Sequence, residues 1–168
     1  MKYEGDIIRP PSEATSLLLQ VTVGCSHNRC TFCHSFQGKT FRIKPFEEIK
    51  EDIDEAAGYG RISRVFLADG DALIIPQPRL TWIMRRIREE MPWIQRVGLY
   101  GNAKSILRKT PDELAELRDL GLGIVYLGLE SGDPQVLREI NKGVAPERMV
   151  EAARRVREAG VKLSVTVL

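Results

Sequence analysis

The chain has 168 residues, of which 43% are hydrophobic and 29% are charged, and its formal net charge is +2. This length fits one ordinary domain, and the near-balance of charge gives no general attraction to nucleic acid or to a membrane surface. No apolar stretch is long enough to cross a bilayer, and residues 1–16 contain no apolar signal region, so we expect a cytoplasmic protein.

The first predicted element follows a polar, proline-containing lead over residues 1–15. The stretch LLLQVTV, residues 17–23, is rich in Leu and Val and ends at a glycine, which predicts a buried strand. The next stretch, GCSHNRCTFCHSF, contains every cysteine in the chain, namely Cys25, Cys30 and Cys33. The cysteines are therefore expected on a loop that leaves the carboxyl end of this strand.

Strands and helices alternate along the rest of the sequence. Further strands are predicted at RVFLADG, RVGLYG, IVYLGLESG and KLSVTVL, and helices over residues 46–57, 77–91 and 146–160 and from Thr110 and Asp133. Such alternation is typical of parallel strands joined by helical crossovers. We expect an α/β fold of five strands, with the last strand at the end of the chain and exposing an apolar edge. We therefore expect the sequence to be the front part of a longer protein.

The cysteine loop indicates a metal site. An odd number of cysteines in a reducing compartment argues against a disulfide framework. Thiolates hold iron–sulfur clusters, usually four of them for a four-iron cluster, so three leave one iron open for a ligand. A competing interpretation is a zinc site that adds His27 or His34 to the three cysteines, in a zinc-stabilised binding module without catalytic activity. A simple electron carrier is another, although a fourth cysteine would be expected for it.

Polar or glycine-rich residues follow each of the next three predicted strands. They are Asp69-Gly70-Asp71, Tyr100-Gly101-Asn102 and Glu130-Ser131-Gly132. Each group has a purely structural explanation as a turn or as the start of a helix. Because the carboxyl ends of parallel strands meet at one edge of the sheet, we expect these groups to form one rim with the cysteine loop.

With this loop and rim, the sequence resembles the catalytic domain of the radical S-adenosylmethionine (radical SAM) superfamily, particularly methylthiotransferases and oxygen-independent coproporphyrinogen oxidases. The resemblance rests on the three cysteines with Phe32 before the last one, on FLADGDAL and on YLGLESGDPQVLREINKG. Two departures are visible. The usual family spacing C-x3-C-x2-C is one residue shorter, and the glycine-glycine-glutamate segment of the family reads Asp69-Gly70-Asp71 here.

The resemblance implies a partial TIM-like (β/α) barrel of six strands, of which residues 16–168 form an incomplete core. It implies a four-iron four-sulfur cluster on Cys25, Cys30 and Cys33, and S-adenosylmethionine at the open iron. The residues implied to contact S-adenosylmethionine are Gly70, Asp71, Asn102, Glu130 and Ser131. The implied reaction is reductive cleavage to a 5′-deoxyadenosyl radical, which abstracts hydrogen from an unidentified substrate. A reductant such as flavodoxin or ferredoxin is the implied partner, and neither nucleic acid nor a membrane is indicated.

Overall fold

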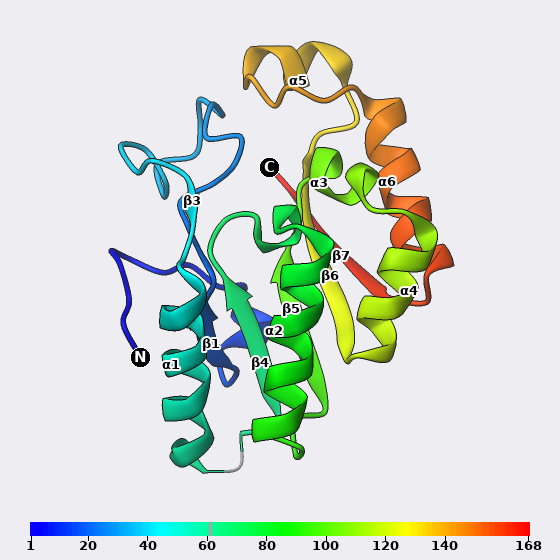
Figure 1. Ribbon diagram of the computed structural model, residues 1–168. Helices are drawn as coiled ribbons and strands as arrows, with labels where there is room; N and C mark the ends of the chain where they lie inside the picture. Colours follow the sequence, from blue (N-terminus) through cyan, green and yellow to red (C-terminus); the bar gives the residue numbers. More distant parts are fainter. Residues whose placement is uncertain (61) are drawn as a thin grey trace.

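A computed structural model describes residues 1–60 and 62–168. Its main sheet has five strands in the order β1-β4-β5-β6-β7, and every neighbouring pair is parallel (Figure 1). The strands are β1 (Leu17–Gln20), β4 (Arg64–Ala68), β5 (Arg96–Tyr100), β6 (Leu122–Glu130) and β7 (Lys162–Val167). The predicted α/β class and the five parallel strands are thereby confirmed.

The first predicted strand is divided in two, so the prediction of one continuous strand over residues 17–23 is wrong. After β1, the segment Thr22–Val23 (β2) pairs antiparallel with Arg42–Ile43 (β3) in a separate two-stranded sheet. The chain leaves the main sheet at Val21, whose N–H still donates to the carbonyl of Ala68 at 2.6 Å. The consequence is that β2 and β3 form the two stems of the cysteine loop.

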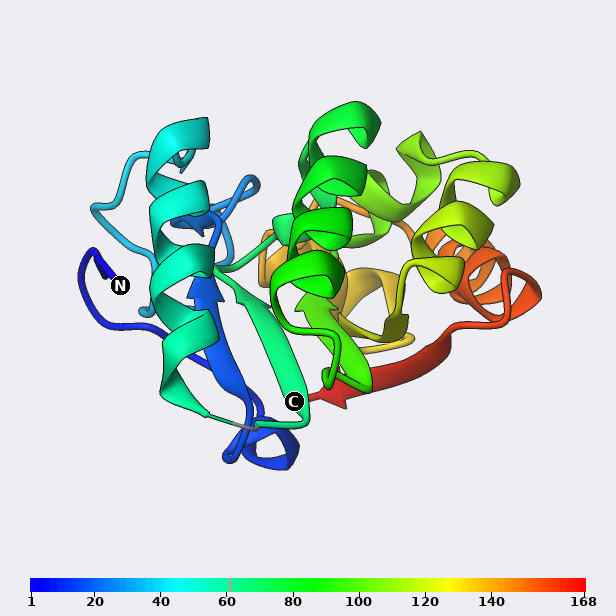
Figure 2. The same cartoon turned by 60° about the horizontal axis from the view of Figure 1, so that its bottom comes forward.

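The helices other than α5 cover one side of the main sheet (Figure 2), and α5 lies beyond the carboxyl ends of the strands (Figure 1). They are α1 (Phe46–Ala56), α2 (Gln77–Glu90), α3 (Ala103–Arg108), α4 (Pro111–Asp119), α5 (Pro134–Glu139) and α6 (Pro146–Glu158). All five predicted helices are confirmed, and α4 begins with a capping box between Thr110 and Glu113. The short helix α3 was not predicted. Within the described residues, no helix is both long and apolar enough to span a membrane.

The two faces of the sheet pack against different partners because side chains alternate along a strand. Leu19, Leu67 and Leu99 belong to the large core between the sheet and the helices, and all three are fully buried. Phe66 and Tyr126 belong to a smaller cluster on the opposite face.

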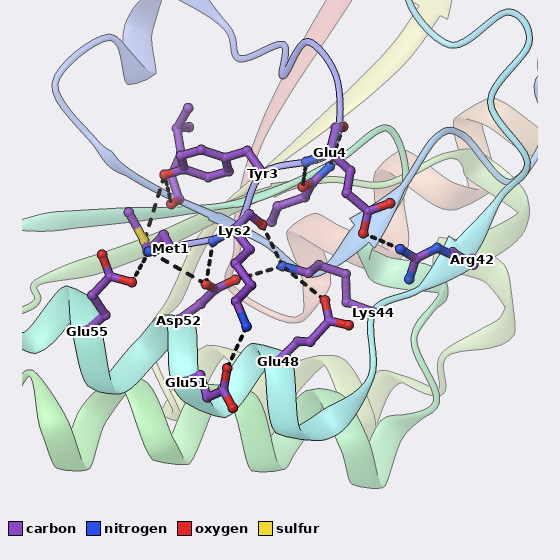
Figure 3. Close-up of polar contacts among 12 residues, drawn as sticks. Met1, Lys2, Tyr3, Glu4, Arg42, Lys44, Glu48, Glu51, Asp52 and Glu55 are labelled. Carbon is purple, nitrogen blue, oxygen red and sulfur yellow. Dashed lines mark hydrogen bonds and ion pairs between the residues drawn. The ribbon is translucent and has the colours of Figure 1, made fainter.

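The N-terminal lead packs onto both of these regions. Glu13, in the short 3-10 helix Pro11–Glu13 (η1), is fully buried and accepts a 2.6 Å hydrogen bond from the hydroxyl of Tyr126. At the other end of the lead, the backbone of Lys2 contacts a buried ion pair, in which Nζ of Lys44 lies 2.7 Å from Oδ2 of Asp52 (Figure 3). Residues 1–15 therefore pack against the core and against the base of the cysteine loop.

Candidate functional site

The three cysteines line a single cavity of about 200 Å³ at the carboxyl ends of the strands. Cys25, Cys30 and Cys33 are half-buried free thiols on the loop between β2 and β3, which Figure 1 shows beyond the arrowheads of the main sheet. The rings of Phe32 and Phe36 line the cavity beside them. The predicted proximity of this loop to the strand ends is confirmed.

The rest of the cavity wall comes from the ends of the main strands and the turns that follow them. Of the five residues implied to contact S-adenosylmethionine, Gly70, Asn102 and Glu130 line the cavity, whereas Asp71 and Ser131 do not. Further lining side chains are Ile8, His27, Tyr100, Ala103, Lys104, Tyr126, Lys142, Val144, Met149 and Thr166. The lining is thus apolar and aromatic, with a few polar groups, as is usual for small-molecule sites.

Asp71 joins three loops from behind the cavity wall. It is fully buried, and its carboxylate accepts hydrogen bonds from Ser105 Oγ at 2.6 Å, from Asn102 Nδ2 at 2.7 Å, from Asn102 N at 3.2 Å and from Ser26 Oγ. Burial raises the pKa of Asp71, and these donors act in the opposite direction. Because Ser26 directly follows Cys25, this carboxylate ties the cysteine loop to the ends of β4 and β5.

Asp69 and Gly70 support the loop from below. The N–H of Gly24 donates to Oδ2 of Asp69 at 3.0 Å, and the N–H of Gly70 donates to the carbonyl of Gly24 at 3.2 Å. A Cβ atom on Gly70 would lie 2.7 Å from the ring of Phe36 and 2.9 Å from Cβ of Cys25. Only glycine allows this close approach between the end of β4 and the first cysteine.

Glu130 and Lys142 form the charged part of the cavity wall. Their ion pair measures 2.9 Å, and the side chains are only 9% and 13% exposed. Glu130 adopts a positive φ of 64° at the end of β6, which turns its carboxylate back over Gly128. Burial raises the pKa of the Cys30 thiol, and the charge of Lys142 opposes that shift by favouring the thiolate.

The turn after α5 holds the cysteine loop from its outer side. His27 Nε2 lies 2.7 Å from the carbonyl of Asn141, and the N–H of Thr31 donates to the carbonyl of Ile140 at 3.0 Å. His34 is exposed and its ring contacts Gln37. The two histidines of the zinc interpretation thus have other contacts. Across residues 1–60 and 62–168, no three His, Cys, Asp or Glu side chains are grouped to hold a single metal ion.

The donor set fits an iron–sulfur cluster. Three thiols and no fourth cysteine are present in the whole sequence, and all three face one cavity with aromatic walls. Thiolates of such a cluster bind separate irons, so they surround a volume, whereas the ligands of a single zinc ion must converge on one point.

Comparison with known proteins identifies the family of this chain. The model of the radical SAM superfamily matches residues 19–168. A protein of Methanocaldococcus jannaschii described as a methylthiotransferase is 23% identical over 167 residues, which are 95% of this chain and 36% of that protein. An uncharacterized methyltransferase of Pyrococcus horikoshii is 26% identical over 141 residues, which are 82% of this chain and 29% of that protein.

Solved structures show the same fold. The cobalamin-dependent S-adenosylmethionine radical enzyme OxsB superposes with a TM-score of 0.73 at 23% identity, over 90% of this chain and 23% of that one. Coproporphyrinogen III oxidase HemN of Escherichia coli, a radical SAM enzyme, gives a TM-score of 0.63 at 15% identity, over 90% of this chain and 36% of that one. The predicted α/β fold is confirmed, since the parallel sheet and its helices superpose on those of radical SAM enzymes. In the described residues the sheet is open and does not close into a barrel.

The chain spans about a third of the length of the curated relatives it matches. Members of the matched superfamily use a four-iron four-sulfur cluster and S-adenosylmethionine, and solved neighbours contain them. With a family match across residues 19–168, the chain belongs to the radical SAM superfamily of enzymes.

Proposed function

We propose that Cys25, Cys30 and Cys33 bind a four-iron four-sulfur cluster and that the adjoining cavity binds S-adenosylmethionine. The observation that carries this proposal is that all three thiols line one cavity with Gly70, Asn102 and the Glu130–Lys142 pair. When bound and reduced, the cluster supplies the electron that cleaves S-adenosylmethionine to methionine and a 5′-deoxyadenosyl radical, which then takes hydrogen from a substrate.

The charged pair is suited to the amino-acid part of this ligand. The ammonium of Lys142 can pair with a carboxylate, and the carboxylate of Glu130 can accept from an ammonium or a hydroxyl group. Both side chains are largely withdrawn from water, which strengthens such contacts. We therefore propose direct ligand contacts for Gly70, Asn102, Glu130 and Lys142.

Asp71 and Ser131 receive indirect roles in this proposal. The carboxylate of Asp71 is engaged by protein donors and supports the cysteine loop. The hydroxyl of Ser131 accepts from the N–H of Asp133 at 3.0 Å and helps to begin α5. Both residues thus act by placing the groups that line the cavity.

The aromatic walls have a protective role. Phe32, Phe36, Tyr100 and Tyr126 surround the polar groups of the cavity, and the rings of Tyr100 and Tyr126 pack edge to face at 6.0 Å. A reactive radical has to be kept away from bulk water and stray hydrogen donors. We propose that these rings exclude water from the cavity.

We also propose that a reductant such as flavodoxin or ferredoxin acts on the whole protein. The proposed location of the protein is the cytoplasm. The substrate of the whole protein is left open.

The test is anaerobic reconstitution of the full-length protein with iron and sulfide, followed by dithionite and S-adenosylmethionine. We expect a brown protein, a reduced-cluster signal in electron paramagnetic resonance, and 5′-deoxyadenosine in the product mixture. Cys30→Ala should abolish all three, whereas His34→Ala, at an exposed position in the same loop, should retain them. A colourless protein that holds one zinc through the cysteines would refute the proposal.

A further inference from the structure

A basic groove borders the cavity that contains the cysteines. It consists of two adjoining hollows of about 400 Å³ each, which share Lys104 and Arg108 of α3. The first hollow is also lined by His27 and Arg29 of the cysteine loop, and the second by Arg148 of α6. The groove therefore runs from the cysteine loop along α3 to the start of α6.

Within the described residues, three of the four Lys and Arg side chains of the groove have no carboxylate partner. Within residues 1–60 and 62–168, the side chains of Arg29, Lys104 and Arg108 form no ion pair, and neither hollow is lined by an Asp or Glu. Arg148 pairs with Glu151 on its own helix. The chain as a whole has 25 Lys and Arg against 23 Asp and Glu, so this excess of positive charge is local.

One carboxylate, that of Asp71, lies behind the groove wall. It is fully buried and receives hydrogen bonds from Ser26, Asn102 and Ser105, which themselves line the first hollow. Burial raises the pKa of this carboxyl, and the charge of Arg108 opposes that shift. Apart from the pair of Arg148 with Glu151, three exposed cations therefore border a single shielded carboxylate, and the groove has a positive potential.

The groove and the cavity share part of their walls. His27, Asn102 and Lys104 line both, so a ligand held in the groove lies directly beside the cavity that contains the cysteines. A redox partner needs only a surface near the cysteine loop. A substrate has to be held next to the reacting groups of the cavity, and this adjacency favours a substrate over a protein partner.

We propose that this groove binds successive phosphate groups of the substrate, supplied either by the diphosphate of a small molecule or by the phosphodiesters of a strand. Phosphate oxygens accept strong, charge-assisted hydrogen bonds from Arg and Lys. A single carboxylate satisfies one of these cations, whereas consecutive phosphates engage several at once. Phosphate binding is independent of the cluster, and only its role in substrate binding rests on the proposed function.

The experiment is calorimetric titration of the metal-free chain with inorganic pyrophosphate at low ionic strength. Lys104→Gln combined with Arg108→Gln should weaken binding by at least about tenfold, because two charge-assisted contacts are lost. The matched control is Arg154→Gln with Arg157→Gln, which removes the same charge from exposed positions of α6. This control should bind like the wild type, and thermal unfolding should show that both pairs are folded.

A second arm uses a short oligouridylate. Binding that depends on Lys104 and Arg108 and is displaced by pyrophosphate identifies a strand as the phosphate source, whereas binding of pyrophosphate alone identifies a small diphosphate. Absence of pyrophosphate binding, or equal weakening by both variant pairs, would overturn the proposal. Cys30→Ala should bind pyrophosphate normally, which separates failure of the groove from failure of the cluster assignment.

Discussion

Nζ of Lys142 lies 2.9 Å from Oε1 of Glu130, although a helix and two turns separate the two residues in the sequence. Removal of the lysine leaves a nearly buried carboxylate without its partner. We expect Lys142→Ala to lower the free energy of unfolding by about 1–3 kcal/mol, as measured by urea denaturation. It should also weaken binding of S-adenosylmethionine at least about tenfold, because the ligand loses a charge-assisted hydrogen bond from the lysine.

The double variant Lys142→Ala with Glu130→Gln separates these two effects. Stability should return to within about 1 kcal/mol of the wild type because no buried charge is left unpaired. The affinity for S-adenosylmethionine should stay low, since the polar contacts are still missing. Recovery of both properties would mean that the pair has no contact with the ligand.

Gly70→Ala tests the close approach between β4 and the cysteine loop. The added methyl would meet Phe36 at 2.7 Å and Cys25 at 2.9 Å, so one of the two has to move. We expect a loss of about 1–3 kcal/mol in unfolding free energy, as is typical of overpacking, and less iron per chain after reconstitution. Gly58→Ala is the control, because a Cβ atom added there would meet nothing within 4 Å. Equal iron content in both variants would contradict this account.

Asp71→Asn tests the carboxylate that joins three loops. The amide keeps the size of the side chain, but it replaces one accepting oxygen with an NH2 group, which can only donate. This NH2 group would then face the hydroxyl and amide groups that donate to the carboxylate in the wild type. The expected cost is about 1–3 kcal/mol for a buried group left without its partner, together with a faster loss of the reconstituted cluster. Asp54→Asn, on an exposed part of α1, should change neither the stability beyond about 0.5 kcal/mol nor the cluster.

Lys109 gives a pH dependence with a definite sign. Its Nζ donates to the carbonyl of Ile75 at 2.7 Å in a buried position, and burial lowers its pKa below the ordinary value. Between this lowered pKa and the usual value near 10.5, the unfolded chain binds the proton and the folded chain does not. Stability contributed by this residue therefore rises with pH through that window.

The measurement for Lys109 is the difference in unfolding free energy between the wild type and Lys109→Met at several pH values. The unfolding free energy of the wild type should increase relative to that of the variant as the pH rises towards the ordinary pKa of lysine. A difference that stays constant with pH, or falls, would show that the lysine is not desolvated in the folded protein.

Much of the fold could be predicted because its elements are long and periodic. The strands around Leu67 and Leu99 are buried apolar runs, and α4 carries a complete capping box in its sequence. The division of residues 17–23 could not be predicted, since a ladder of two residues has no periodic pattern. Helix α3 was missed for a similar reason, because six residues show less than two turns of amphipathic pattern and Asn102 fits a turn equally well.

The candidate site was predicted at the level of strand ends but not at the level of side-chain direction. Asp71 and Gly70 are adjacent, yet one is behind the wall and the other lines the cavity, because the backbone of the turn decides which way each residue faces. Lys142 was not singled out, since its contact with Glu130 exists only once α5 has folded back over the loop. The spacing of residues in the sequence does not predict that the chain folds back in this way.

The cysteine loop is anchored at three places, by Asp69 at Gly24, by Asp71 at Ser26 and by the turn at Asn141 through His27. None of these anchors involves a thiol. The loop is consequently preorganised before the cluster is assembled. The conformational entropy of the loop is lost when the chain folds and not when the cofactor binds. A chain built this way should accept and release its metal without unfolding, so that maturation and repair after oxidative damage can act on the same folded protein.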